Sequence, residues 1–379
     1  MSQFKVAIFT GNYNHIRDGV SLTLNRLVSF LMEQGVEVVV FGPTISKPAF
    51  DHAGTLIAVP SKKMPGRPEY RISTGLPEEQ QLQLEKFDPD LVHIATPDLL
   101  GLKALKWAEK NKKPVVASYH THFSSYLKYY KLSVLEPLMW RYLAWFYAKC
   151  CHVYVPSSSM TKILREKNIK TDFRIWARGI DFDRFHPSKR DEKWRQEKGF
   201  LEGDIIVTFI SRLVWEKNLK LFSDVVNRLQ SEHKRVKSLV VGDGPGAQEM
   251  MRLMPKTIFT GFLEGEELSK AYANSDIFFF PSDTETFGNV TLEAMASGLP
   301  CVVADATGSK SLVEHGKNGY LVSVNDPDKF FNLIEKLILD LELRKQMAYA
   351  SLEKAKEYSW ANVNGQLLNY YKEVLELKK

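Results

Sequence analysis

Two glutamates stand eight positions apart in the stretch from Phe280 to Gly298. Glu285 lies in a predicted loop, and Glu293 lies in the first turns of a helix that is predicted to start near Asn289. The backbone amides of residues 287–290 then stand free at the N-terminus of that helix. Carboxylates accept hydrogen bonds from hydroxyl groups and amides donate them to anions, so the stretch suits a ligand with many hydroxyls and a phosphate.

Two cations, Arg212 and Lys217, follow the strand that is predicted for residues 204–210. At the carboxyl end of a strand they can converge on a diphosphate, the arginine as a planar fork and the lysine as a point charge. Taken alone, the pair also fits an ordinary solvated loop. The next predicted strand leads into Gly242, in a turn rich in glycine that permits close packing or the approach of a ligand.

Gly19 stands where a long helix is predicted to start, shortly after the first predicted strand. Glycine lets a ligand approach the backbone there, and a helix N-terminus favours a phosphate. An ordinary loop turn is the alternative. The segment does not have the form GxGxxG, which argues against a redox enzyme that binds NAD.

Short β-branched runs alternate with helical patterns, the arrangement typical of βαβ units and parallel sheets. The first series of strands is predicted at 5–9, 37–41, 91–95, 114–120, 151–155 and 173–176. The second series is predicted at 204–210, 236–241, 257–262, 277–281 and 300–303. The polar stretch 179–203 separates them, which predicts domains at 1–185 and 186–359. Two doubly wound, Rossmann-like α/β domains of this kind are expected to face a central cleft that holds the ligand.

Length and composition bound the class of protein. A chain of 379 residues suggests two domains, and 44% hydrophobic with 25% charged residues excludes a disordered or collagen-like protein. The three cysteines offer neither a disulfide framework nor a CxxC pair. The first residues lack the features of a secretory signal, and no uncharged apolar stretch approaches the roughly 18 residues of a spanning helix. We therefore expect a cytoplasmic protein that does not cross a membrane.

The basic excess lies in the first half of the chain. Residues 1–180 hold 24 Lys and Arg against 15 Asp and Glu, a balance of +9, which leaves −3 of the total of +6 for the remainder. Such an asymmetry indicates an anionic partner of the first domain, with a well-solvated surface as the alternative.

Aromatic and basic side chains interleave between Tyr126 and Tyr147. A basic helix with such aromatics can lie on an anionic membrane surface. The alternative is a packed core, in which one face of the helix meets the sheet and leaves Trp140, Arg141 and Trp145 elsewhere. The residues expected on that face are Leu135, Leu138, Met139, Tyr142 and Phe146. The basic loop predicted at 62–68 would add to the same patch or line a ligand site of the first domain.

The E-x7-E pair, together with SRLVWEKN, VGDGP, TGFLEGEEL and EAMASGLP, resembles the retaining glycosyltransferases of family 4, which have the GT-B fold. The resemblance covers nearly the whole chain. In the first half RDGVS, RPEYRISTGLP, SYHTHF and RGIDFDRFHP resemble the branch with diacylglycerol-directed transferases, notably sulfoquinovosyl and mannosyl transferases. The plant and cyanobacterial sulfoquinovosyl enzymes tend to have LGFV where this chain has residues 287–290, which leaves the donor sugar open.

The resemblance implies a role for each matching residue. Arg212 and Lys217 hold the diphosphate of the donor, and Glu293 accepts from the nucleotide ribose. Glu285 and the amides beside it bind the hydroxyls of the transferred sugar. His120 lies beside that sugar, and the backbone of Gly19 meets the phosphate. The implied donor-binding set is completed by Gly242, Thr286, Phe287, Gly288, Asn289 and Val290.

The family also implies transfer with retention by a front-face route, without an enzymic nucleophile, and a last helix (360–379) that packs back on the first domain. A histidine satisfied at a strand end is the alternative for His120. HxH at 120–122 lacks a third ligand, and the DxD strings at 88–90, 181–183 and 326–328 fit turns. We therefore expect no metal and no cofactor.

The expected partners are a nucleotide sugar, with UDP or GDP, and a lipid or glycan acceptor, in the synthesis of cell-envelope glycolipids or glycans, but not nucleic acid. The protein is then free in the cytoplasm or peripheral on the inner face of the cell membrane. The remaining alternatives are a non-catalytic protein that binds sugar nucleotides and a nucleotide-sugar epimerase.

Overall fold

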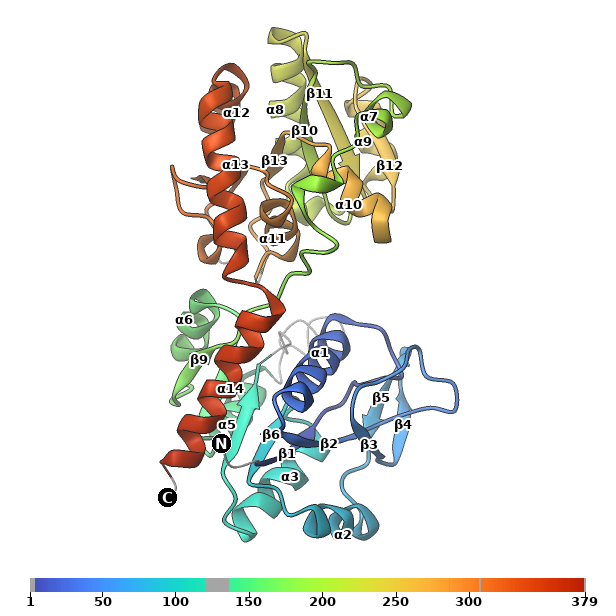
Figure 1. The fold of residues 1–379 in the computed structure, drawn as a ribbon, viewed down its shortest axis with the longest axis vertical. Helices are drawn as coiled ribbons and strands as arrows, with labels where there is room; N and C mark the ends of the chain where they lie inside the picture. Colours follow the sequence, from blue (N-terminus) through green and yellow to red (C-terminus); the bar gives the residue numbers. More distant parts are fainter. Residues whose placement is uncertain (1–3, 120–135, 286, 307, 378–379) are drawn as a thin grey trace. The chain divides into compact units, whose positions relative to one another are not determined.

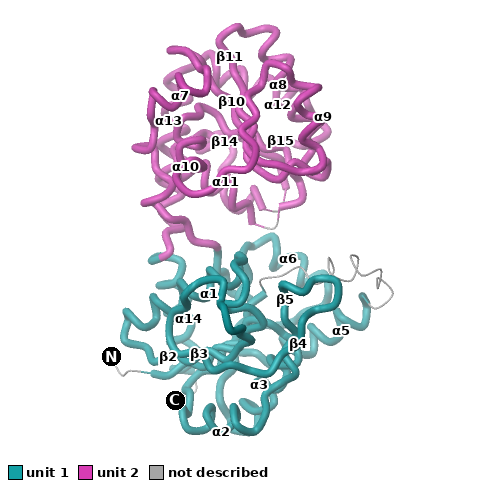
Figure 2. Tube along the Cα trace, turned by 90° about the vertical axis from the view of Figure 1, so that its right-hand side faces the viewer, with its two compact units in different colours: residues 1–177, 361–379 teal, residues 178–360 magenta. Residues whose placement is uncertain are grey.

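The computed structural model describes residues 4–119, 136–285, 287–306 and 308–377. The chain divides into two compact units, which Figure 2 colours separately. Unit 1 comprises residues 1–177 with 361–379, and unit 2 comprises residues 178–360. Each unit is built around its own parallel sheet with helices packed on it (Figure 1).

Unit 1 has a seven-stranded parallel sheet in the order β3-β2-β1-β6-β7-β8-β9. Its strands are almost wholly buried in the middle of the sheet, as continuous apolar runs in a sheet covered on both faces must be. The strands are β1 (Lys5–Phe9), β2 (Glu37–Gly42), β3 (Thr55–Ala58), β6 (Leu91–Ile94), β7 (Val115–Ser118), β8 (His152–Val155) and β9 (Phe173–Ile175). The helices are α1 (Gly19–Glu33), α2 (Glu78–Phe87), α3 (Leu99–Lys110), α5 (Glu136–Tyr147), α6 (Ser158–Glu166) and α14 (Trp360–Glu376).

Unit 2 has a six-stranded parallel sheet in the order β12-β11-β10-β13-β14-β15. The strands are β10 (Ile205–Ile210), β11 (Val236–Val241), β12 (Ile258–Gly261), β13 (Ile277–Phe280), β14 (Cys301–Ala304) and β15 (Gly319–Val322). The helices are α7 (Glu192–Glu197), α8 (Leu219–Glu232), α9 (Ala247–Leu253), α10 (Gly265–Ala273), α11 (Asn289–Ala296), α12 (Pro327–Leu339) and α13 (Leu341–Lys356), with a 3-10 turn η3 (Trp215–Lys217). Both units are therefore doubly wound α/β folds.

The two units meet along the chain earlier than the sequence predicts. Residues 178–185 belong to unit 2, whereas the predicted boundary was 185. The physical reason is packing, because Ile180 pairs with Ser359, Gly179 lies against the ring of Trp360, and Phe185 is buried edge-on against Tyr272. The final helix belongs to unit 1 from Ala361 onward.

The basic loop predicted at 62–68 is in fact an antiparallel ribbon of β4 (Ser61–Met64) and β5 (Arg67–Ser73). Lys63 lies opposite Arg71 in the ribbon. The Arg71 guanidinium donates hydrogen bonds to the hydroxyl and the carbonyl oxygen of Ser61. The sequence did not predict these strands, because the segment is rich in charged residues, is interrupted by the Pro65-Gly66 turn, and lacks the alternation of apolar and polar residues that is typical of a strand. Strands β3 and β15 were also absent from the prediction.

The expected core face of α5 is confirmed for Phe146, which is buried, and for Met139 and Tyr142, which pack against the core, but it is wrong for Leu138. Trp140, Leu143, Phe146 and Tyr147 are buried, whereas Leu138 is 63% exposed. Trp140 was expected on another face, but its indole donates to Glu136 and lies under Lys167. The other residues of the predicted aromatic segment, up to residue 135, lie outside the described part of the chain.

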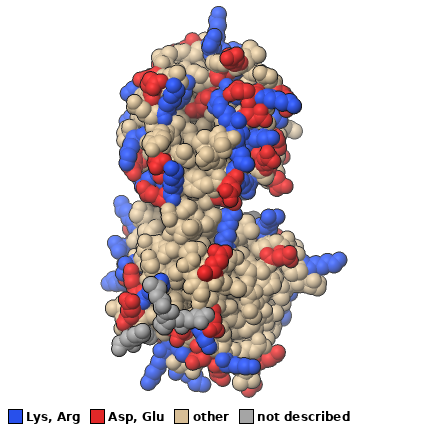
Figure 3. All heavy atoms as spheres, viewed as in Figure 1, with Lys and Arg blue, Asp and Glu red and all other residues tan. Residues whose placement is uncertain are grey.

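No described helix is both long and apolar enough to span a bilayer. On the face of unit 2 shown in Figure 3, acidic and basic side chains are intermingled. That face therefore offers no broad surface of a single charge.

Candidate functional site

The predicted ligand-binding loops of unit 2 lie at the carboxyl edge of its sheet. Strand order reverses between β10 and β13, which are direct neighbours although three helices and two strands separate them along the chain. Arg212 and Lys217 follow β10, and Glu285 follows β13, so all three flank this switch point. Ligands of open α/β sheets bind outside the carboxyl ends of the strands at such a point.

Lys217 and Glu285 are brought together by this arrangement. The ammonium Nζ of Lys217 donates to Glu285 Oε1 at 2.5 Å and to Thr284 Oγ1 at 3.1 Å. Lys217 is 8% exposed, although it ends a short 3-10 turn in a loop. The next residue, Asn218, is left-handed and donates to the carbonyl of Pro281 at 2.8 Å. The loops after β10 and β13 are thus held to each other, with an ion pair between them.

Arg212 stands out from the same loop. Its side chain is exposed, and within the described residues it has no hydrogen bond or ion pair. Because a guanidinium carries five N–H donors in a planar fork, an uncommitted arginine beside the switch point can meet a phosphate without breaking an internal contact.

Helix α11 begins at Asn289, where the sequence predicts it. Gly288 precedes it in the left-handed conformation with φ of 94°, and no side chain caps the first turn. The amides of Asn289, Val290 and Thr291 have no partner among the described residues. Phe287 is buried edge-on against Tyr358, so it anchors the loop rather than pointing to solvent. The start of α11 therefore retains the donors that an anion or hydroxyl would use.

Glu293 lies one turn into α11 and is only partly accessible. Its Oε2 accepts from the phenol of Tyr272 at 2.9 Å. Burial of the carboxylate raises the pKa of Glu293 to about 7, against the smaller opposing effects of the Tyr272 hydrogen bond and the charge of Arg184. Tyr272 and Arg184 were not predicted as site residues, because nothing in their spacing connects them to Glu293.

The glycines of the site have different structural reasons. Gly242 has φ of 133°, and a Cβ on it would lie 1.9 Å from the carbonyl oxygen of Ser211, so contact between two loops accounts for it. A Cβ on Gly308 would lie 2.8 Å from that of Glu285, so this glycine, which the sequence analysis did not single out, lets its loop pack on the Glu285 loop.

Gly19 in unit 1 has no such internal reason. It is the exposed first residue of α1, its φ is not in the left-handed region, and a Cβ there would meet nothing within 4 Å. Asp18 caps the helix by accepting from the amides of Val20 and Ser21. His120 and Thr286, the other predicted site residues, lie outside the described residues.

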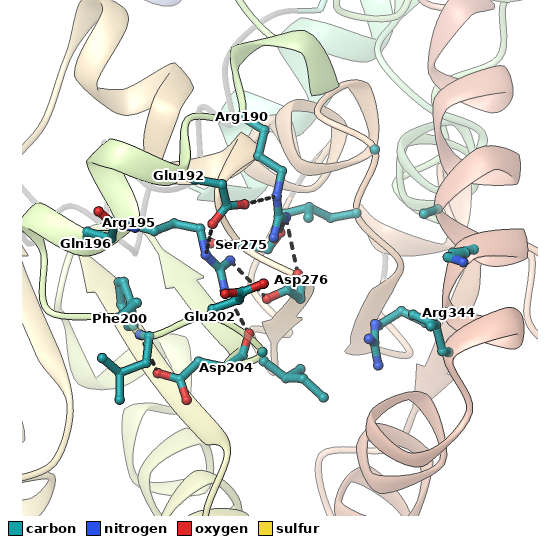
Figure 4. Close-up of a pocket in the computed structure, with 18 residues that line it drawn as sticks. Arg190, Glu192, Arg195, Gln196, Phe200, Glu202, Asp204, Ser275, Asp276 and Arg344 are labelled. Atoms are coloured by element: carbon teal, nitrogen blue, oxygen red, sulfur yellow. Dashed lines mark hydrogen bonds and ion pairs between the residues drawn. The ribbon is translucent and has the colours of Figure 1, made fainter.

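A pocket of about 740 Å³ opens at the opposite, amino edge of the unit 2 sheet (Figure 4). Its centre is a network in which the buried Arg195 donates to the carbonyls of Asn274 and Asp204 and pairs with Asp276. Arg190 pairs with Asp276 as well. Both arginines therefore have partners within the protein, and their contacts attach α7 to the sheet. None of the predicted site residues lines this pocket.

The aspartates of the DxD strings make contacts that support the fold. Asp90 accepts from the amide of Lys5 at 2.8 Å, and Asp181 accepts from the amide of Asp183 at 3.2 Å. Asp326 caps α12 ahead of Pro327. The contacts of Asp181 and Asp326 are those of a turn and a helix cap, whereas Asp90 joins the start of β6 to the start of β1.

Two family models match the chain, Glycosyltransferase Family 4 over residues 17–184 and Glycosyl transferases group 1 over residues 190–354. The chain is 31% identical to the GDP-mannose-dependent alpha-mannosyltransferase of Corynebacterium glutamicum, over 99% of this chain and 90% of that protein. It is 27% identical to the alpha-monoglucosyldiacylglycerol synthase of Streptococcus pneumoniae, over 97% and 85% of the two chains. Among solved structures, sucrose-phosphate synthase from Thermosynechococcus elongatus matches with a TM-score of 0.73 and 17% identity, over 99% of this chain and 100% of that one.

Proposed function

Because the chain belongs to glycosyltransferase family 4 and is a glycosyltransferase with the GT-B fold, we propose that it transfers a hexose from a nucleoside-diphosphate sugar to a lipid acceptor with retention of configuration. The predicted family, fold and enzyme class are confirmed. The donor, the acceptor and the stereochemistry are the parts that we propose.

The observation that carries the proposal is the set of polar groups around the unit 2 switch point. Arg212 is uncommitted, Lys217 is held at 2.5 Å from Glu285, and the first amides of α11 have no capping side chain. When a diphosphate binds, the ammonium of Lys217 can donate to it instead of to Glu285. The Glu285 carboxylate can then accept hydrogen bonds from sugar hydroxyls. The same groups would then stabilise the charge that develops on the departing diphosphate, so neither an enzymic nucleophile nor a metal is required.

The lipid acceptor rests on separate support. The Streptococcus pneumoniae relative is named for a diacylglycerol product, and the first 180 residues of this chain carry the basic excess. On α5 the side chains of Leu138, Arg141 and Trp145 lie one turn apart and are exposed, Leu138 by 63% and Trp145 by 44%. An apolar, basic and aromatic stripe of this kind is suited to the headgroup layer of an anionic membrane.

The test is an assay with radiolabelled UDP- and GDP-hexoses, and diacylglycerol vesicles with and without anionic lipid, in the presence of a chelator. We expect a labelled lipid whose anomeric configuration, by NMR, equals that of the donor. Inversion would contradict retention, and transfer only to soluble glycans would contradict the lipid acceptor. An isomerised nucleotide sugar without transfer would favour the epimerase.

Two variants connect this activity to the site. Replacing Lys217 by Met should lower nucleotide affinity by roughly tenfold or more, since a charge-assisted hydrogen bond is lost. The matched control is Lys220→Met, because Lys220 is exposed and, within the described residues, forms its ion pair with Asp224 on its own helix. Equal affinities in the two variants would remove Lys217 from the phosphate site. His120→Ala should lose turnover while it keeps nucleotide affinity.

A further inference from the structure

We propose that Tyr272 is a positioning residue that holds the carboxylate of Glu293 oriented toward the donor nucleotide, with the charge of Arg184 as a weaker support. The inference rests on the proposed function, because it concerns the use of Glu293 in binding that nucleotide. Tyr272 lies outside the motifs that the sequence singles out, and Arg184 lies in the RGIDFDRFHP segment but was given no role there. Tyr272 comes from α10, Arg184 comes from the segment that enters unit 2, and Glu293 lies on α11.

Tyr272 fixes one oxygen of the carboxylate. Its phenol donates to Glu293 Oε2 at 2.9 Å, and its ring is fully buried. The ring meets Phe185 edge-on, with centroids 5.6 Å apart, and it packs against the tilted ring of Phe278 of β13 at 6.2 Å. The other oxygen, Oε1, has no hydrogen-bond partner within the described part of the chain. A carboxylate tied down through one oxygen can offer the other to a hydroxyl in a fixed direction.

Arg184 acts on the same carboxylate from a greater distance. It is exposed, it lies over the ring of Phe185 at 4.9 Å, and its positive charge favours the ionised form of Glu293. Arg184 therefore acts on Glu293 through its charge, and the next residue, Phe185, acts through its contact with Tyr272. In the described residues, the Cys301 thiol on β14 also affects the pKa of Tyr272. Burial raises the pKa of that thiol, so the thiol stays protonated and uncharged.

The support is needed because burial opposes ionisation. The pKa of Glu293 is raised to about 7, so the free protein is balanced between the two forms near neutral pH. Protonation puts a hydrogen on an oxygen that should accept from a ribose hydroxyl. Nucleotide affinity should therefore fall as the pH drops through the pKa of Glu293, and loss of either supporting residue should raise that pKa and move the fall to higher pH.

The experiment is titration calorimetry of the full chain with UDP and GDP from pH 5.5 to 9, for the wild type, Tyr272→Phe and Arg184→Gln. Phenylalanine keeps the buried ring and removes only the hydroxyl. The midpoint of affinity against pH should rise in Tyr272→Phe by roughly one pH unit or more, which makes binding about tenfold weaker on the acid side of the wild-type midpoint and nearly equal at pH 9. Arg184→Gln should shift the midpoint in the same direction by less, and only at low salt, since added salt screens an exposed charge.

The matched control is Tyr320→Phe, which removes the hydroxyl of another buried tyrosine of unit 2, on β15. Its profile should follow that of the wild type. A wild-type profile in Tyr272→Phe, or equal weakening at every pH, would overturn the inference and leave the proposed function standing. Absence of UDP and GDP binding in all four proteins would overturn the nucleotide-binding role of Glu293 and the proposed function together.

Discussion

Two glycines of the predicted site differ in what they do for the fold. Gly242 is required by contact with the backbone of Ser211, whereas Gly19 is surrounded by open space. Packing within the protein therefore accounts for a glycine at position 242 but not at position 19. The family resemblance selected both residues, but it could not separate these reasons, because the separation depends on distances between loops that are remote in sequence.

We predict that Gly19→Ala keeps the melting temperature, since alanine at the start of α1 meets no atom within 4 Å and adopts its backbone angles without strain. Its rate of sugar transfer should fall by roughly tenfold or more, because a methyl group displaces whatever approaches the backbone there. Melting and transfer assays check this. Gly242→Ala is the contrasting variant, and its melting temperature should be lower than that of the wild type. An unchanged transfer rate in Gly19→Ala would show that the position is an ordinary turn.

Chemically distinctive residues and spacings are what the sequence could offer as candidates for the site. Two short segments supplied four of these candidates, Arg212 with Lys217 and Glu285 with Glu293. The structure pairs Lys217 of the first segment with Glu285 of the second. Tyr272 escaped prediction because it is an ordinary apolar position of α10, 21 residues before the glutamate that it contacts. A single sequence contains no signal for such a contact.

At the scale of elements, α14 is fixed to unit 1 by a buried hydrogen bond as well as by its apolar face. The hydroxyl of Tyr371 lies 2.6 Å from Nδ1 of His93 on β6, and Nε2 of that histidine lies 2.6 Å from the hydroxyl of Ser118 at the end of β7. Burial lowers the pKa of His93 to about 3, so the ring stays neutral and both nitrogens depend on these partners.

We predict that Tyr371→Phe destabilises unit 1 by about 1–3 kcal/mol, because it leaves a polar nitrogen unpaired in the core. Urea unfolding followed by circular dichroism measures the loss. Tyr349→Phe is the control, since Tyr349 is 68% exposed and its hydroxyl is open to water. A stability equal to that of the control would mean that the apolar face of α14 alone holds the helix.

The central strands and most helices could be predicted from apolar runs and their periods. The failures were the β4–β5 ribbon, where five charged side chains replace the apolar face of a strand, and two positions of α5, where Leu138 is exposed and Trp140 is buried. In α5 nearly every position is apolar or aromatic, so the period does not select one face, and contacts with the sheet decide it.

At the scale of the whole molecule, the chain consists of two units, each with its own sheet and buried core. Two such units are expected to unfold in separable transitions. The variant Tyr371→Phe should lower the transition of unit 1 and thereby identify it. A ligand that binds only a folded unit stabilises that unit, by about 2.7 kcal/mol when its concentration is one hundred times its dissociation constant. The transition temperature of that unit then rises.

The most direct test of the account is differential scanning calorimetry of the wild type and Lys217→Met with UDP, GDP, ADP and TDP, without added metal. The account predicts that UDP or GDP raises the unit 2 transition of the wild type, and that the rise is much smaller in Lys217→Met. The claim that the carboxyl edge of the unit 2 sheet holds the diphosphate would be contradicted if no nucleotide moved that transition, or if Lys217→Met responded like the wild type.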